Sequence, residues 1–301
     1  MNYQTIEEII KKAQTASKPK ILAVAGAGEE HTLEAVLKAE RDGIVRAILI
    51  GNVIAIKEIL KKYDANVSDY EIVDGSENPA DIAVQLVREE KADILMKGNV
   101  QTGDLIRPIL NKERGIMKGE LLSHVLFVQA PAYKKIFLVT DSAIVPNPDL
   151  KQKIAILQNA VNTMNALGYI KPKVAVLAAV EVVNPKMQET VDADEIKRIC
   201  EETGTPDCIV AGPISMDIAF DAEAGGIKGF DSPVAGNPDI LLMPNLLTGN
   251  IAVKTLRVFG QSTIAGLVVG ASSSIVLTSR STSAMGKYQS IALGAAIATG
   301  T

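Results

Sequence analysis

The stretch ILAVAGAG at residues 21–28 consists of five apolar residues followed by a glycine-rich turn. A short apolar run bounded by glycine is typical of a β-strand that is buried on both faces. The residues that follow, as far as Arg41, have the spacing of an amphipathic helix. The stretch therefore predicts a strand–turn–helix unit, the building block of a parallel α/β sheet.

The same alternation of apolar runs and amphipathic stretches continues along the whole chain. Residues 6–13 have a single apolar stripe and predict an N-terminal helix. We expect further strands at residues 45–50, 70–73, 93–96, 125–128, 135–139, 174–179, 208–211, 240–243 and 275–278. There is no internal repeat and no obvious linker. The chain therefore predicts two tightly packed α/β domains, with a cleft between them as the default ligand site.

Composition excludes several classes of protein. The 301 residues are 47% hydrophobic and 22% charged, which is typical of a soluble globular protein. The net charge of −4 argues against nucleic-acid binding. Two cysteines and an N-terminus without an apolar signal segment predict a cytoplasmic protein. Residues 258–279 carry no charge, but their serines and Gly270 favour two short strands over a membrane span.

Four polar segments are expected directly after strands, where α/β sheets place their ligand sites. They are residues 97–104, 140–142, 229–237 and 278–283. Any one of them alone is most simply a tight turn. Together they offer many glycine N–H groups and five side chains that suit an anion. These are Lys97, Arg107, Lys228, Ser279 and Arg280.

The C-terminal part of the chain has an uneven charge distribution. From Ile240 to Thr301 there is no Asp or Glu, although the segment carries Lys254, Arg257, Arg280 and Lys287. Either this is an interior region with little surface, or its basic residues bind an anionic ligand, which we favour. The pair Ser279-Arg280 follows the predicted strand 275–278, so its hydroxyl and guanidinium are well suited to phosphate oxygens.

Other motifs are weaker. Residues 26–31 lack the third glycine of a dinucleotide fingerprint and would set two carboxylates against a phosphate, so we interpret them as a plain turn. His31 and His124 are the only histidines, which excludes a site of several histidines, and no metal is expected. We interpret His124 as structural, because the adjacent Ser123 would point to the opposite face of a strand. Cys200 and Cys208 are expected to be packed residues.

The stretch SPVAGNPDILLMPNLLTGNIAVK at residues 232–254 resembles the signature of the phosphate acetyl/butyryltransferase family. Three further segments agree with the family in the same order, at residues 97–108, 141–148 and 277–280. The resemblance covers about residues 20 to 298. The segment VNPKM at residues 183–187, together with TSRS in place of LSRG at residues 278–281, is more similar to the butyryl branch.

This resemblance implies an isocitrate/isopropylmalate dehydrogenase-like architecture. Residues 1–119 and 265–301 would form the first α/β domain and residues 120–264 the second, with the active site between them. The implied reaction interconverts acyl-CoA, most simply butyryl-CoA, plus phosphate and acyl phosphate plus coenzyme A, by direct thiol attack in a ternary complex. Coenzyme A is then a substrate, no further cofactor is expected, and the family implies a homo-oligomer.

The same resemblance implies roles for individual residues. Ser279 and Arg280 would be catalytic and grip the acyl phosphate, and Arg107 would contact a phosphate of coenzyme A. The other residues implied in substrate binding are Lys97, Thr102, Asp141, Ser232, Gly236 and Asn250.

One departure from the family pattern concerns the general base. In the acetyl branch a catalytic Asp follows the Ser-Arg pair, but residues 281–301 contain no carboxylate. The base is therefore unassigned, with Asp141 and Asp231 as the available strand-end carboxylates. Two alternatives stay open: a phosphate acetyltransferase, and a non-catalytic protein that binds coenzyme A or acyl phosphate.

Overall fold

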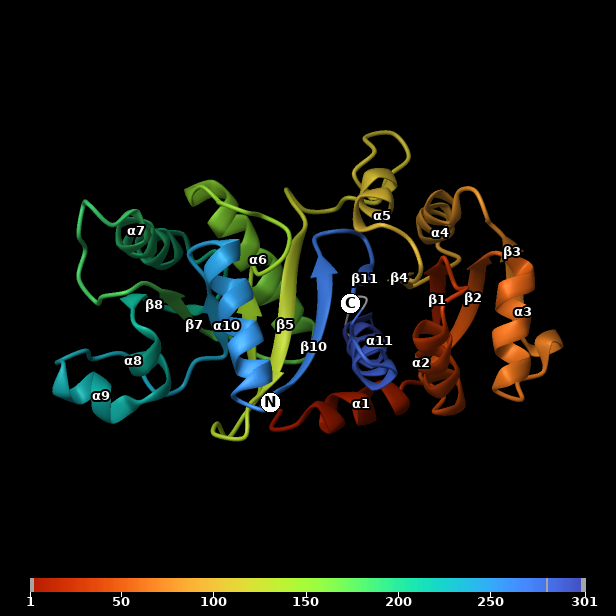
Figure 1. Cartoon of the computed structure of the whole chain (residues 1–301). Coiled ribbons are helices and arrows are strands. Elements are labelled where there is room, and N and C mark those ends of the chain that lie inside the picture. The colour runs from red at the N-terminus through yellow and green to blue at the C-terminus, as the bar shows by residue number, and fades with distance from the viewer. Residues whose placement is uncertain (1–2, 280, 299–301) are drawn as a thin grey trace. The chain divides into compact units, whose positions relative to one another are not determined.

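The computed structural model describes residues 3–279 and 281–298. The chain divides into two compact units, shown as a ribbon in Figure 1. Unit 1 comprises Met1–Ile6 and Leu121–Ile264, and unit 2 comprises Glu7–Glu120 and Ala265–Thr301.

Unit 2 has a mixed sheet with the strand order β3-β2-β1-β4-β11-β10. Neighbouring strands from β3 to β11 are parallel, and β10 is antiparallel to β11. The strands are β1 (Lys20–Ala25), β2 (Val45–Gly51), β3 (Glu71–Asp74), β4 (Ile94–Lys97), β10 (Thr263–Val269, which enters the unit at Ala265) and β11 (Ser274–Val276). The helices are α1 (Ile6–Gln14), α2 (Glu30–Arg41), α3 (Val53–Lys62), α4 (Pro79–Arg88), α5 (Thr102–Ile109) and α11 (Ala284–Ala298), with a 3-10 turn at Val67–Asp69.

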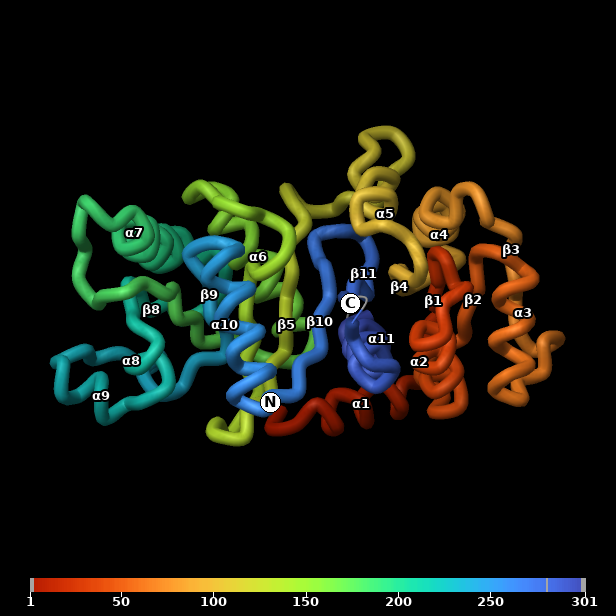
Figure 2. Tube along the Cα trace, in the orientation of Figure 1, coloured from red at the N-terminus to blue at the C-terminus, as the bar shows by residue number. Residues whose placement is uncertain are grey.

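Local sequence explains where the helices of unit 2 begin. The Glu29 carboxylate accepts hydrogen bonds from the backbone N–H groups of His31 and Thr32, which caps α2. Pro79 lies in the first turn of α4, where its missing N–H costs nothing. The C-terminal helix α11 packs against α2, although the two are far apart in the sequence (Figure 2).

The strands of unit 1 follow one another in the order β5-β6-β9-β7-β8. β5 and β6 form an antiparallel pair, and β6, β9, β7 and β8 are parallel. The strands are β5 (Ser123–Gln129), β6 (Phe137–Thr140), β7 (Lys173–Leu177), β8 (Ile209–Ile214) and β9 (Ile240–Leu242). The helices are α6 (Leu150–Ala166), α7 (Gln188–Thr203), α8 (Met216–Phe220), α9 (Ala222–Ile227) and α10 (Leu246–Val258).

The predicted α/β class is confirmed, and all the predicted strands are present to within a few residues. The predicted domain boundaries and the dehydrogenase-like architecture stay predictions. Residues 258–279 contain the two short strands β10 and β11, and none of the described helices is long and apolar enough to cross a membrane. Residues 229–237 follow helix α9, so the expectation that this segment follows a strand was wrong. The reason is that α8 and α9 are too short to give a helical period in the sequence.

Candidate functional site

The loops that follow three parallel strands of unit 1 lie at one edge of its sheet. Since β6, β9 and β7 are parallel neighbours, their carboxyl ends face the same way. This is the edge at which α/β sheets bind ligands. The loops after β6 and β9 belong to two of the segments in which the family resemblance was found, at residues 141–148 and 232–254. The structure therefore brings these two segments together.

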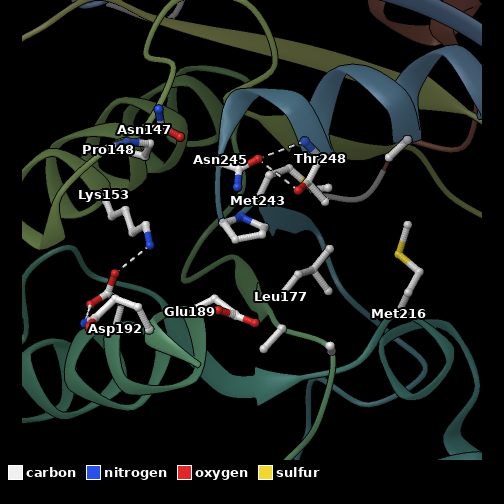
Figure 3. Close-up of a pocket in the computed structure, with 15 residues that line it drawn as sticks. Asn147, Pro148, Lys153, Leu177, Glu189, Asp192, Met216, Met243, Asn245 and Thr248 are labelled. Atoms are coloured by element: carbon white, nitrogen blue, oxygen red, sulfur yellow. Dashed lines mark hydrogen bonds and ion pairs between the residues drawn. The ribbon is translucent and has the colours of Figure 1, made fainter. Parts of the chain in front are cut away.

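A cavity of about 550 Å³ opens at this edge of unit 1 (Figure 3). Its buried base is formed by Pro148, Leu177 and Met243, from three different segments of the chain. Residues at the mouth are partly or largely exposed, among them Asn147 and Met216. The volume is that of a small-molecule site, and most of the lining is apolar with a few polar groups.

One wall of the cavity carries a buried ion pair between α6 and α7. Lys153 Nζ lies 2.6 Å from Asp192 Oδ2, and both side chains are about nine-tenths buried. The other oxygen of Asp192 accepts a hydrogen bond of 2.8 Å from Gln188 Nε2. A buried pair is tolerated where its geometry is good and the remaining groups are hydrogen-bonded. The ammonium of Lys153 is therefore neutralised within the protein.

The opposite wall is the first turn of α10. Asn245 caps this helix, because its Oδ1 accepts hydrogen bonds of 2.9 Å from both the N–H and the hydroxyl of Thr248. The carbonyl of the amide is thus engaged, and its NH₂ group is left as a donor. Figure 3 shows Asn245 and Thr248 joined in this way at the rim of the cavity.

Two of the predicted substrate-binding residues, Asp141 and Asn250, make hydrogen bonds within the loop after β6 or to it. The Asp141 carboxylate, 3% exposed, accepts hydrogen bonds from the backbone N–H groups of residues 143, 144 and 145. Asn250 Nδ2 donates to the backbone oxygen of Ser142. A Cβ at Gly249 would lie 2.4 Å from the backbone oxygen of Asp141, so only glycine permits this approach. Asp141 therefore organises its own loop, and its substrate-binding role stays a prediction.

His124 has a hydrogen-bond partner that the sequence did not indicate. Its Nδ1 lies 3.0 Å from Ser142 Oγ, and both residues are buried. Burial lowers the pKa of His124 below its ordinary value, although the negative charge of Asp141 acts in the opposite direction. The imidazole is therefore neutral at physiological pH. The antiparallel register of β5 and β6 sets His124 beside the loop after β6, which a hairpin alignment of the two strands could have indicated.

The corresponding edge of unit 2 holds two buried lysines. Lys97, at the end of β4, donates to the backbone oxygens of Gly98 and Val100 at 3.2 and 2.9 Å. Lys287 Nζ lies 3.6 Å from Glu29 Oε2 and 3.4 Å from Thr278 Oγ1. Both lysines are positively charged groups next to the loop after β11. The adjacency of β1, β4 and β11 brings these loops together within the unit.

The remaining predicted residues of unit 2 are exposed or lie outside the described residues. Ser279 follows β11 and is exposed, with its hydroxyl 3.1 Å from that of Ser281. Arg280 lies outside the described residues. Thr102 is the first residue of α5, and Arg107 on the same helix makes an exposed ion pair of 3.4 Å with Asp104. Their predicted roles are compatible with this exposure and stay predictions.

Ser232 and Gly236 lie apart from the other predicted residues of unit 1. They precede β9, whereas Asn245 and Asn250 follow it, so the strand separates the two groups. The Ser232 hydroxyl accepts a hydrogen bond from the N–H of Val234. Gly236 has φ of +68°, and a Cβ there would lie 2.7 Å from the backbone nitrogen of Ala222. The structure therefore explains Gly236 by the shape of a turn.

The basic residues expected to bind an anion differ in their ion-pair partners and in their exposure. Lys228 makes ion pairs of 3.0 Å with both Glu181 and Asp217, so it is engaged within unit 1. Lys254 and Arg257 are exposed on α10. Lys287 is buried and pairs with Glu29, an acidic residue from another part of the chain. Such a partner is what we expected if residues 240–301 form an interior region with little surface. Within residues 3–279 and 281–298, no cluster of three or more His, Cys, Asp or Glu could hold a metal ion.

The sequence is similar, over nearly its whole length, to a known protein family and to characterised relatives. The family described as Phosphate acetyl/butaryl transferase matches residues 4–81 and 76–295. The phosphate butyryltransferase of Clostridium acetobutylicum is 42% identical over 98% of both chains, and the phosphate acetyltransferase of Thermotoga maritima is 34% identical over 97% of this chain and 99% of its own.

Solved structures give the same result. A branched-chain phosphotransacylase from Enterococcus faecalis is 32% identical, with a TM-score of 0.82 over 93% of this chain and 99% of its own. A phosphotransacetylase from Streptococcus pyogenes, 21% identical, shares the fold with a TM-score of 0.84 over 99% of both chains. With nearly the whole length matched by the family and by these relatives, the chain belongs to the phosphate acetyl/butyryl transferase family and is an acyltransferase that acts with phosphate.

Proposed function

We propose that this enzyme interconverts butyryl-CoA plus phosphate and butyryl phosphate plus coenzyme A. The observation that carries the proposal is the exposed Ser279, which follows β11 in a loop whose Thr278 is bound by the buried Lys287. An exposed hydroxyl in a loop held in this way can donate to the oxygens of phosphate or an acyl phosphate. The butyryl preference is supported by the names of the relatives from Clostridium acetobutylicum and Bacillus subtilis, at 42% and 38% identity.

The proposed mechanism is direct transfer in a ternary complex. In one direction a phosphate oxygen attacks the thioester carbonyl carbon, the C–S bond breaks, and coenzyme A leaves as the thiolate. In the other direction the thiolate attacks the carbonyl of the acyl phosphate and releases phosphate. Ser279 would position the phosphate, and Arg280 would stabilise the negative charge that develops in the transition state.

A positive field is the proposed means of activating the thiol. A thiol of pKa about 8.5 is only a few per cent ionised at neutral pH, so either a base or a cationic environment must raise that fraction. Asp141 is a poor base, because three backbone N–H groups already occupy its carboxylate. Asp231 precedes β9, apart from the strand-end loops of unit 1. The guanidinium of Arg280 is therefore the group that we assign to this task.

The decisive experiment is a phosphate-dependent thiol-release assay with butyryl-CoA. Arg280→Ala should lower kcat by about 10²–10³, the usual cost of removing a donor to developing negative charge. Arg257→Ala, at an exposed position of α10, is the matched control and should leave kcat unchanged. Near-native turnover by Arg280→Ala would remove Arg280 from the mechanism.

Acetyl transfer is the second candidate, favoured by the 34% identity to the Thermotoga maritima phosphate acetyltransferase. The same assay with acetyl-CoA and branched acyl-CoA separates the two candidates, since each buried methylene contributes roughly 0.8 kcal/mol. Binding of coenzyme A without phosphate-dependent thiol release would instead indicate a non-catalytic binding protein. We further propose a homo-oligomer, which light scattering of the purified protein would test.

A further inference from the structure

The two cysteines of the chain lie where helix α7 leads into strand β8 in unit 1 (Figure 1). Cys200 is in the last turn of α7, and Cys208 directly precedes β8, which packs against that helix. Gly204 has φ of +65° and ends the helix, with its N–H bonded to the backbone oxygen of Cys200 at 2.9 Å. The short segment 205–207 then returns the chain, so the fold brings the two thiols together.

The two thiols interact directly with each other. A hydrogen bond from Cys208 is the largest influence on the pKa of Cys200 and lowers it, against the opposing effect of burial. The same hydrogen bond, together with burial, raises the pKa of Cys208. In the neutral pair the Cys208 thiol donates to the backbone oxygen of Pro206 at 3.3 Å, and its S–H can rotate towards Cys200 when that sulfur ionises. Cys200 is therefore the thiolate of the pair and Cys208 its donor.

This arrangement suits the chemistry of a redox-active dithiol. A thiolate is the nucleophile that reacts with peroxides, and an adjacent thiol can capture the resulting sulfenic acid before it is oxidised further. Cys200 is only 6% exposed, and Cys208 is half-buried. Bulky electrophiles are therefore disfavoured, whereas hydrogen peroxide is little larger than water. A sulfinate or sulfonate on Cys200 would place a charged group in a buried position, which is costly.

We propose that Cys200 and Cys208 are a modification site at which a peroxide forms a reversible disulfide. The Cys200 thiolate attacks one oxygen of hydrogen peroxide, the O–O bond breaks, and the departing hydroxide combines with the proton that the thiol released, giving water and a sulfenic acid. The Cys208 sulfur attacks the sulfenic sulfur, the S–O bond breaks, and the proton of Cys208 leaves with the hydroxide as a second water. The two sulfurs are oxidised and the peroxide is reduced. A thiol reductant reverses the reaction by exchange, so the pair protects a buried sulfur from irreversible oxidation.

The test exposes the native enzyme to a slight excess of hydrogen peroxide and counts its thiols in denaturant. The count should fall from two to none, and a thiol reductant should restore both. Glu201 and Glu202 lie between the two cysteines, so a protease that cleaves after glutamate separates them into two peptides. In the oxidised enzyme these peptides should stay joined, with the mass of two hydrogen atoms lost, until a reductant is added.

Single variants identify the attacking thiol. In Cys208→Ser the serine hydroxyl can still donate to Cys200, so the sulfenic acid should form at Cys200 and be trapped by dimedone. Without a second thiol, continued oxidation should add oxygen irreversibly and lower the unfolding midpoint, whereas the native enzyme should regain its midpoint after reduction. Cys200→Ser leaves Cys208 without its partner and should consume peroxide at least about tenfold more slowly than Cys208→Ser. Unfolding midpoints before treatment show that each variant is folded.

Retention of both thiols by the native enzyme in peroxide would overturn the assignment. So would addition of oxygen to either cysteine without a disulfide, or a disulfide between two copies of the chain on a non-reducing gel. Equal peroxide consumption by the two variants would show that the contact between the thiols does not set their ionisation, which also contradicts the proposal. These measurements need no acyl substrate, so a failure of the proposed transfer reaction would leave the disulfide assignment untouched.

Discussion

The strand-end loops of the two units differ in how their polar groups are engaged. In unit 1, the Asp141 carboxylate accepts hydrogen bonds from the backbone of its own loop, and the Asn250 side chain donates to the backbone oxygen of Ser142. In unit 2, Lys97 donates to the backbone of the loop after β4 and Lys287 donates to Thr278, while the hydroxyl of Ser279 is exposed. The polar groups of unit 1 therefore fix the conformation of their loops, whereas those of unit 2 include basic side chains and a hydroxyl that a ligand can reach. Residue type alone does not separate these two uses.

In both units, however, a glycine permits a close contact between two backbone segments. A Cβ at Gly98 in unit 2 would lie 2.2 Å from the backbone oxygen of Gly26, and a Cβ at Gly249 in unit 1 would lie 2.4 Å from that of Asp141. Neither glycine has a positive φ, so the requirement is close packing. Gly98 lets the loop after β4 approach the backbone of the loop after β1, and Gly249 lets the first turns of α10 approach that of the loop after β6.

The largest effects are expected from filling these two contacts. Gly98→Ala and Gly249→Ala should each lower the free energy of unfolding by about 3 kcal/mol, because a backbone carbonyl has to move. Chemical denaturation measures the loss. The matched controls are Gly103→Ala in α5 and Gly226→Ala in α9, where a Cβ meets nothing within 4 Å. These should gain up to about 1 kcal/mol from helix propensity. Equal stability of Gly249→Ala and Gly226→Ala would contradict the packing role.

A pair of side-chain truncations tests the contrast between shape and chemistry. Asp141→Ala should cost about 2 kcal/mol of stability, because three backbone N–H groups lose a charged acceptor. Ser279→Ala should leave the unfolding midpoint nearly unchanged and lower kcat by about 10², as expected for an exposed hydroxyl that positions the substrate. Denaturation and the thiol-release assay on both variants check this. A stable Asp141→Ala that has lost only turnover would show that unit 1 also supplies chemistry.

Local features of the fold were predictable from the sequence because they depend on near neighbours. The apolar run at residues 21–25 gives β1, and Asn78-Pro79 begins α4, since burial pattern and backbone restriction act within a few residues. Pairings between distant segments were not predictable. Lys153 and Asp192 are 39 residues apart, and His124 meets Ser142 only through the register of a hairpin.

The candidate site was predicted in part for the same reason. The position of Ser279 after an apolar strand follows from a local pattern, and the structure confirms that position. Gly236, in contrast, was assigned to substrate binding through the family resemblance, whereas its left-handed turn and close contact with Ala222 explain a glycine there. A family motif contains residues that stabilise a loop as well as residues that bind a ligand. Only the tertiary contacts distinguish the two kinds.

The smallest expected effect is that of removing the negative charge of Glu29, which pairs with Lys287 in unit 2. Burial raises the pKa of Glu29, but hydrogen bonds from Thr32 and His31 and the charge of Lys287 outweigh it, so that the pKa lies below its ordinary value. A depressed carboxyl pKa contributes stability that is present above the unfolded value, about 4.3, and is lost as the pH falls through the folded value. The stability difference between native enzyme and Glu29→Gln should therefore be constant above about pH 5 and shrink at lower pH. Glu58→Gln, at an exposed position of α3, should show no such dependence. A difference that persists unchanged into acid would mean that Glu29 acts through shape alone, as Asp141 does in unit 1.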